Sequence, residues 1–340
     1  MSSILNRINA GLHAAFEKDE RVHLIGEDLL DPYGGAFKVS AGLSDKYPER
    51  VISSPVSEAA ITGIAGGMAL RGLRPVVEIM FGDFITLTAD QLINSISKFR
   101  WMYNEQVDVP IVIRTPMGGR RGYGPTHSQT LEKLFLGTPG LRILAVNSLQ
   151  DPAEMLEAAI LQDDGPVLFI ENKLLYSKQW LQEKDLSDYE IERSPAKKNY
   201  AASFLLRLRQ APAPCYTLAT YGYMAELARE ALNRLAFEEE IFGELYVAGQ
   251  ISPLPENQQL SEMLIESIKK TGSLLSVEEG TLSYAWGAEI LARAARFFGS
   301  QAIKMDRVAA ADQTIPASIA MEIRMLPSVE DIMAAVRAMV

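Results

Sequence analysis

The amino-acid sequence predicts an α/β protein with parallel sheets, and three observations support this fold class. Short apolar runs typical of buried strands alternate along the chain with longer amphipathic runs typical of helices. The 340 residues are enough for two domains of ordinary size. The composition is 48% hydrophobic and 22% charged, which is typical of a globular protein and argues against extended disorder.

The first half of the chain contains five strand-like runs with helices between them. Apolar residues recur at helical spacing from Ile4 to Phe16, and this spacing predicts an N-terminal helix. Further helices are expected over 90–103 and 152–161, and the latter would complete a βαβ unit. The predicted strands cover 22–25, 74–80, 109–114, 142–146 and 167–170.

A segment rich in Lys, Glu, Asp, Ser and Gln separates the two halves and is interpreted as a linker. The predicted boundaries are a first domain over 1–180, a linker over 181–205 and a second domain over 206–340. Within the second domain, helices are expected over 224–236, from residue 284 onwards and over 328–339. The expected strands cover 216–222, 245–248, 274–277 and 303–305.

Charge and composition exclude several classes of function. A net charge of −10 disfavours a nucleic-acid partner, because phosphate binding depends on clustered Lys and Arg. No apolar stretch approaches the roughly 20 residues that span a bilayer, so no membrane association is expected. The single Cys215 cannot form an internal disulfide, and the N-terminus lacks a secretory apolar core. The expected location is the cytoplasm.

Glu58 is the first candidate functional residue. It begins an apolar helix that contains Gly63, Gly66 and Gly67, where an unpaired charge is hard to solvate. Carboxylates in such surroundings are often functional, because they can hold or share a proton. Alternatively, Ser57 is an N-cap and Glu58 only interacts favourably with the helix dipole. On this segment alone, the helix-start interpretation is the simpler one.

The order of several further motifs changes that balance. Along the chain they are Gly26–Asp28, Tyr33–Val39, Pro55–Ala60, Gly72–Glu78, Asp83–Phe84, Asp90–Gln91 and Thr126–Gln129. With these motifs in this order, the sequence resembles the β subunit of thiamine-diphosphate-dependent 2-oxo acid dehydrogenases, which include the pyruvate, branched-chain and acetoin enzymes. The resemblance implies a transketolase-like pyrimidine-binding domain followed by a transketolase C-terminal domain.

The resemblance implies roles for three residues at the thiamine diphosphate cofactor. Glu58 would hydrogen-bond the pyrimidine nitrogen opposite the amine and so promote activation of the cofactor. Phe84 would stack on the aminopyrimidine ring, although Phe81 is close by and an ordinary core role is the alternative. Glu27 matches an acidic residue that helps to link paired active sites, and its alternative is a solvated loop acid beside Asp28.

The resemblance also implies substrate contacts. His127 matches the histidine of the family's histidine-serine-glutamine motif, and it would bind a 2-oxo acid carboxylate or handle a proton during acyl transfer. The other two histidines, His13 and His23, are interpreted as structural. Arg120 and Arg121 are candidate grips for a carboxylate or phosphate, and exposed surface arginines are the alternative.

A potassium ion is implied near the end of the helix over 152–161. Ala159 and Asp163 fall where many relatives bind this ion through carbonyl oxygens and an aspartate. The chain carries one extra residue at that point. A plain acidic turn is therefore the alternative interpretation.

One motif of the superfamily is missing from the sequence. Relatives bind the diphosphate through Gly-Asp-Gly followed by Asn about thirty residues later, with Asp and Asn holding Mg²⁺. This chain has no such motif. The resemblance therefore implies an α subunit that supplies the Mg²⁺ ligands in a two-α, two-β heterotetramer. The substrate would be a 2-oxo acid, and the acyl group would pass to a lipoyl acyltransferase. A two-chain thiamine-dependent carboligase and a non-catalytic heteromer partner remain as alternatives.

Overall fold

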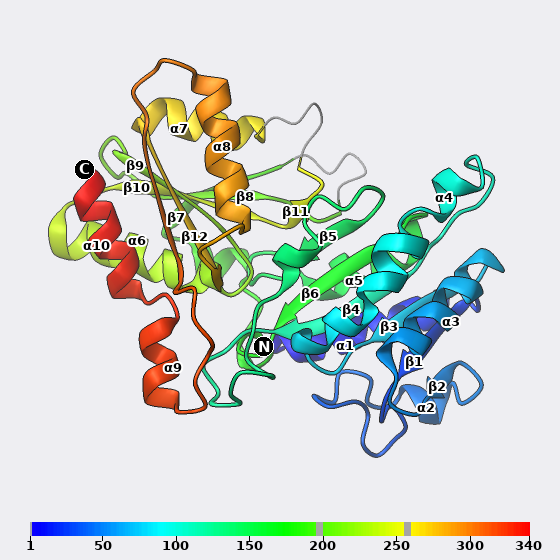
Figure 1. Ribbon diagram of the computed structural model, residues 1–340. Helices are drawn as coiled ribbons and strands as arrows, with labels where there is room; N and C mark the ends of the chain where they lie inside the picture. The colour runs from blue at the N-terminus through cyan, green and yellow to red at the C-terminus, as the bar shows by residue number, and fades with distance from the viewer. Residues whose placement is uncertain (1, 195–199, 255–259) are drawn as a thin grey trace.

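The computed structural model describes residues 2–194, 200–254 and 260–340, in which two sheets are flanked by helices (Figure 1). The α-helices are α1 (Ile4–Lys18), α2 (Leu43–Lys46), α3 (Glu58–Leu70), α4 (Phe99–Met102), α5 (Pro152–Gln162), α6 (Met224–Glu239), α7 (Glu262–Thr271), α8 (Trp286–Phe298), α9 (Ile319–Met325) and α10 (Val329–Met339). The 3₁₀ and π-helical segments are η1 (Gly82–Thr88), η2 (Gln91–Ile96), η3 (Glu132–Leu134), η4 (Leu175–Ser177) and η5 (Glu183–Leu186).

The first sheet has seven strands in the order β11-β5-β6-β4-β3-β1-β2, and all neighbours are parallel except β11 with β5. Its last strand, β11, comes from the second half of the chain. The strands are β1 (Val22–Gly26), β2 (Val51–Ser53), β3 (Arg74–Glu78), β4 (Val112–Met117), β5 (Arg142–Ala145), β6 (Val167–Asn172) and β11 (Gln250–Ser252).

The second sheet has six strands in the order β13-β12-β9-β10-β8-β7. Its four strands from β13 to β10 are parallel, and β8 and then the edge strand β7 continue the sheet in antiparallel pairing. The strands are β7 (Tyr189–Arg193), β8 (Phe204–Leu208), β9 (Tyr216–Tyr221), β10 (Gly243–Ala248), β12 (Ser273–Thr281) and β13 (Lys304–Ala310).

Alternate residues of the central first-sheet strands enter different cores, because successive strand side chains point to opposite faces. Leu24 packs in a core with α1 and α5, whereas Ile25 packs in a core with α3, η1 and η2. The second of these cores continues into the other sheet, where it includes residues of α7 and α8. A third core lies on the opposite face of the second sheet, beneath α6 and α10.

Local chemistry explains where the predicted helices begin. At α1, the side chain of Ser3 accepts a hydrogen bond from the Asn6 N–H at 3.2 Å, as an N-cap does. At α5, Asp151 caps the helix and Pro152 occupies the first helical position, where its missing N–H costs nothing. Within the described part of the chain, no helix is both long and apolar enough to cross a membrane.

Two segments differ from the sequence-based expectation. The helix expected over 90–103 is present but irregular, because it consists of the π-helical turn η2 followed by the short α4. Its later apolar residues lie on the surface, with Trp101 81% exposed. The expected linker over 181–205 contains η5 and β7, which pairs with β8. Residues 195–199 of that stretch lie outside the described residues.

Candidate active site

The candidate site lies at the carboxyl edge of four neighbouring parallel strands, β6, β4, β3 and β1. Glu27 directly follows β1, and η1 with Phe84 follows β3. The loop over 118–130, which carries His127, follows β4. Ligands of open α/β sheets bind outside the carboxyl ends of the strands, so this is the place where a ligand is expected.

Glu58 and Glu27 form a pair of buried carboxylates. Glu58 is 6% exposed at the start of α3, where Ser57 accepts a hydrogen bond from the Ala60 N–H at 3.4 Å. Burial raises the pKa of Glu27, and the charge of Glu58 raises it further, whereas the backbone N–H of Ser57 acts in the opposite direction. Among the described residues, Glu27 Oε1 has no hydrogen-bond partner. The structure therefore brings these two predicted residues together.

Phe84 belongs to an aromatic group that also contains His127 and Phe81. The imidazole of His127 lies edge-on to both rings, with centroids 5.2 Å from Phe84 and 4.8 Å from Phe81. Phe81 and Phe84 are 5.9 Å apart. Since α3 packs against η1, the Glu58 helix lies beside this aromatic group. Sequence reasoning identified Phe84 and noted Phe81 only as its neighbour.

The two predicted arginines point to different surroundings. Arg121 is exposed, and its guanidinium lies 5.3 Å from the ring of Tyr123 and 6.0 Å from that of Phe37, at the border of the aromatic group. Arg120 instead donates a hydrogen bond to the carbonyl of Pro327 in the second half of the chain. Only Arg121 of this pair is therefore placed beside the candidate site.

The loop that carries His127 is fixed by side chains that sequence reasoning missed. Asp83 accepts hydrogen bonds from both the side chain and the backbone N–H of Gln129, at 2.9 and 3.3 Å. From the second half of the chain, Glu279 accepts from the Gly119 N–H at 2.6 Å, and Glu322 accepts from the Gly122 N–H at 2.8 Å. These two glutamates could not be identified from the sequence, because they belong to no recognised motif and only the fold brings them to the loop.

A buried ionic network lies on the strands that lead to the site. Arg114 in β4 donates to both oxygens of Glu171 in β6, at 2.8 and 2.7 Å, and to Glu78 in β3. Burial raises the pKa of Glu78, and Arg114 opposes that change. Gly35 has a φ of +79°, and a Cβ there would lie 2.3 Å from Glu78 Oε1. This close approach explains why the Tyr33–Val39 motif has glycine at position 35.

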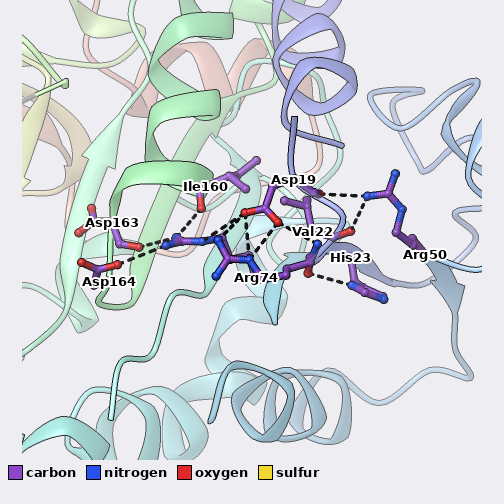
Figure 2. A network of polar contacts seen from close by, with 9 residues as sticks. Asp19, Val22, His23, Arg50, Arg74, Ile160, Asp163 and Asp164 are labelled. Carbon is purple, nitrogen blue, oxygen red and sulfur yellow. Dashed lines mark hydrogen bonds and ion pairs between the residues drawn. The ribbon is translucent and has the colours of Figure 1, made fainter. Parts of the chain in front are cut away.

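The expected potassium ligands lie at the end of α5, where the side chain of Arg74 contacts oxygens of Ile160, Asp163 and Asp164 (Figure 2). Arg74 Nη1 donates to the carbonyls of Ile160 at 2.9 Å and Asp163 at 2.8 Å, and its Nη2 lies 3.3 Å from the Asp164 carboxylate. Arg142 lies 3.2 Å from the Asp163 carboxylate. Ala159 is buried in α5. The oxygens of Asp163 and of its neighbours Ile160 and Asp164 already have cationic partners, so the arrangement does not fit a potassium ion.

Comparison with known proteins identifies the family. Two family models match, "Transketolase, pyrimidine binding domain" over residues 3–179 and "Transketolase, C-terminal domain" over 208–332. The pyruvate dehydrogenase E1 component subunit beta-1, mitochondrial, of Arabidopsis thaliana is 34% identical over 339 residues, covering 98% of this chain and 88% of the relative. The chain belongs to the family of E1 β subunits.

Further comparisons agree with an E1 β-type chain. The pyruvate dehydrogenase E1 component subunit beta of Rickettsia conorii is 32% identical over 322 residues, covering 94% of this chain and 92% of the relative. Among solved structures, a split gene transketolase described as an inactive beta4 tetramer superposes with a TM-score of 0.69 and 16% identity, covering 99% and 98% of the two chains. This second likeness shows a shared transketolase-like fold.

The residues at the carboxyl edge fit the pyrimidine half of thiamine diphosphate. Binding pockets for heteroaromatic rings combine apolar or aromatic side chains with a few polar groups, and the buried Glu58 and the ring of Phe84 are groups of these two kinds. The unpartnered Glu27 Oε1 adds a second buried acceptor there. Among the described residues, no group of three or more His, Cys, Asp or Glu side chains is placed to hold a metal ion. The assignment of the Mg²⁺ ligands to a partner chain remains a prediction.

Proposed function

We propose that this chain supplies the pyrimidine side of the active site in a thiamine-diphosphate-dependent 2-oxo acid dehydrogenase, and that it is active only with an α subunit. The observation that carries the proposal is the buried Glu58, paired with Glu27 at the carboxyl edge and adjacent to the aromatic group. If Glu58 served only to begin a helix, the second buried acid Glu27 beside it would be unfavourable, because like charges repel in a low dielectric. The pair is therefore better explained by a ligand that both acids face.

Each residue has a specific task in this proposal. Thiamine diphosphate, when bound, supplies the electron sink for decarboxylation. Glu58 hydrogen-bonds the pyrimidine ring and holds the proton that this contact requires. The ring of Phe84 stacks on the pyrimidine. His127 binds the carboxylate of the 2-oxo acid or moves a proton while the acyl group is transferred to a lipoyl carrier.

Exposed apolar side chains around the site support an α partner. Val56 is 79% exposed, Ile64 56% and Leu87 55%, and they lie on the segments that carry Glu58 and Phe84. On α3, the exposed Ala60 and Gly67 leave room for another backbone to approach closely. An apolar patch beside polar functional groups is typical of a protein interface. The α chain would complete the site, hold Mg²⁺ and form the two-α, two-β assembly.

Replacing Glu58 by Gln in the assembly reconstituted with its α subunit tests the proposal. We expect turnover of the 2-oxo acid to fall by about 100-fold or more, because a positioned acid or base contributes about 10²–10⁴. The matched control is Glu49→Gln, which changes an exposed acid of the same first domain. Unchanged turnover in Glu58→Gln, with intact assembly, would leave the chain as a non-catalytic partner.

The reaction products distinguish the dehydrogenase from the carboligase, which is the remaining alternative. Formation of S-acyl-dihydrolipoamide and CO₂ from a 2-oxo acid and oxidised lipoamide supports the dehydrogenase. Formation of a new carbon–carbon bond between two carbonyl substrates, without any lipoamide requirement, would make the assembly a carboligase. Both assays use the same reconstituted chains, so the comparison does not depend on differences in folding or cofactor loading.

A further inference from the structure

Lys173 is a buried cation at the candidate site that the proposed chemistry leaves without a role. It directly follows β6, and its side chain is among the largest fully buried ones, with the residue 2% exposed. Its Nζ donates a hydrogen bond to the backbone carbonyl of His127 at 2.6 Å. The same Nζ lies 5.3 Å from the ring centre of Phe81 and 6.0 Å from that of Tyr123.

The backbone of Lys173 is fixed as firmly as its side chain. The Lys173 N–H donates to the carbonyl of Met117, the last residue of β4, at 3.1 Å. The preceding residue, Asn172, accepts from the Leu174 N–H at 2.9 Å and donates to Glu279 at 3.2 Å. Lysine has a long flexible stem, and these contacts reduce the number of positions that its ammonium can reach.

Charged groups from three other elements and one loop face the ammonium. Asp83 in η1, Glu279 in β12 and Glu322 in α9 attract it, whereas Arg121 in the loop over 118–130 repels it. Burial is the largest influence and lowers the pKa of Lys173 to about 8. The ammonium therefore lies between the first domain and the two glutamates of the second half that hold the same loop.

We propose that Lys173 is a positioning residue, an inference that rests on the proposed function. It fixes the main chain at His127, so that the imidazole is held edge-on between Phe81 and Phe84. Lys173 acts through His127, with no contact of its own to the cofactor. A hydrogen bond from an ammonium is stronger than one from a neutral donor, and the surrounding low dielectric strengthens it further. Within the described residues, this is the only hydrogen bond recorded for its Nζ.

Kinetics of Lys173→Met and Lys173→Arg in the reconstituted assembly test this role. In Lys173→Met we expect kcat to fall about 10- to 100-fold, because small displacements of a reacting group have effects of this size. The KM for thiamine diphosphate should change little, since Glu58 and Phe84 remain. Lys173→Arg should retain most of the activity. Lys178→Met, which removes an exposed lysine near the same strand, is the control and should match the unmodified chain.

The pH profile distinguishes positioning from simple packing. In the unmodified assembly, kcat should decline above about pH 8 as the Lys173 ammonium loses its proton. In Lys173→Arg this decline should move to higher pH, because a guanidinium stays charged. In Lys173→Met it should disappear. If Lys173→Arg is as inactive as Lys173→Met, or if the decline stays in place in both variants, the charge has no positioning role and the proposal fails.

A readout without turnover separates this inference from the proposed function. The chain has three histidines, so ring resonances of His13 and His23 are internal references for His127 in the full-length chain. Lys173→Met should shift only the His127 signals, and Lys178→Met should shift none. If Glu58→Gln is fully active while this shift occurs, the cofactor role is wrong but the positioning of His127 stands. If no shift occurs, Lys173 does not position His127.

Discussion

Replacing Glu278 by Gln should change how the stability of the chain depends on pH. Glu278 lies in β12 and is fully buried. Its Oε1 accepts a hydrogen bond from the Gly287 N–H at 2.9 Å, and its Oε2 has no partner among the described residues. Burial raises the pKa of Glu278 to about 7, the Gly287 N–H opposes this, and the nearby Glu132 adds to the rise.

The magnitude follows from the difference between folded and unfolded pKa values. The rise from 4.5 to about 7 is a gap of about 2.5 units. At 1.36 kcal/mol per unit, this gap corresponds to about 3 kcal/mol. Between these pH values the folded state holds the proton and the unfolded chain does not, so the free energy of unfolding decreases as pH rises from about 4 to about 7. Gln has no proton to lose and should not show this contribution.

Urea denaturation of both chains at pH 5 and pH 8 measures the effect. The difference in unfolding free energy between Glu278→Gln and the unmodified chain should move in favour of the variant by about 2.5 kcal/mol on going from pH 5 to pH 8, because pH 5 already lies above the unfolded pKa. Glu49→Gln, an exposed control, should show no such change. A difference that stays constant within about 0.5 kcal/mol across this range would refute the reasoning, because surface substitutions already vary by that amount.

Three further predictions test the packing and the site. Arg114→Met should lower the unfolding free energy by about 3–5 kcal/mol in urea denaturation, because it leaves two buried glutamates without their cation; a change below about 1 kcal/mol would contradict this. Phe84→Leu should weaken thiamine diphosphate binding in the reconstituted assembly about 2- to 10-fold by calorimetry, from the loss of about 0.5–1.5 kcal/mol of ring stacking, and unchanged affinity would argue against that contact. Gly11→Ala should destabilise by about 1–3 kcal/mol, since its Cβ would lie 2.7 Å from the Ala153 carbonyl oxygen, whereas Gly67→Ala, with open space, should be tolerated.

The regular elements of the fold could be predicted because their local signals agree. The helix from Ile4 has both an apolar stripe and a serine cap, and α5 has an Asp-Pro start. The helix expected over 90–103 had an apolar pattern alone. The Ser97 N–H bonds to the Leu92 carbonyl, five residues earlier, and a Cβ at Gly140 would lie 2.2 Å from the Ser97 carbonyl oxygen. That tertiary contact has no local sequence signal.

Residues of the candidate site could be predicted only where they belong to a recognised sequence motif. Glu58, Glu27, Phe84 and His127 all stand in or beside such motifs, and the structure places them along one carboxyl edge. Residues that act from the far half of the chain, such as Glu279, could not be identified. Their contacts depend on how two sheets meet, and a single sequence holds no record of that arrangement.

The crossing of β11 into the first sheet has a consequence for dividing the chain. Gln250 and Ser252 pair with β5, and the Gly249 carbonyl accepts from the Ala145 N–H at 2.8 Å. If residues 1–180 were produced alone, β5 would become an exposed edge strand with unpaired backbone donors and acceptors. Such an edge promotes association with other copies of the chain. The two halves therefore depend on each other for solubility, because ending the chain at residue 252 would in turn leave β9 without its neighbour β12.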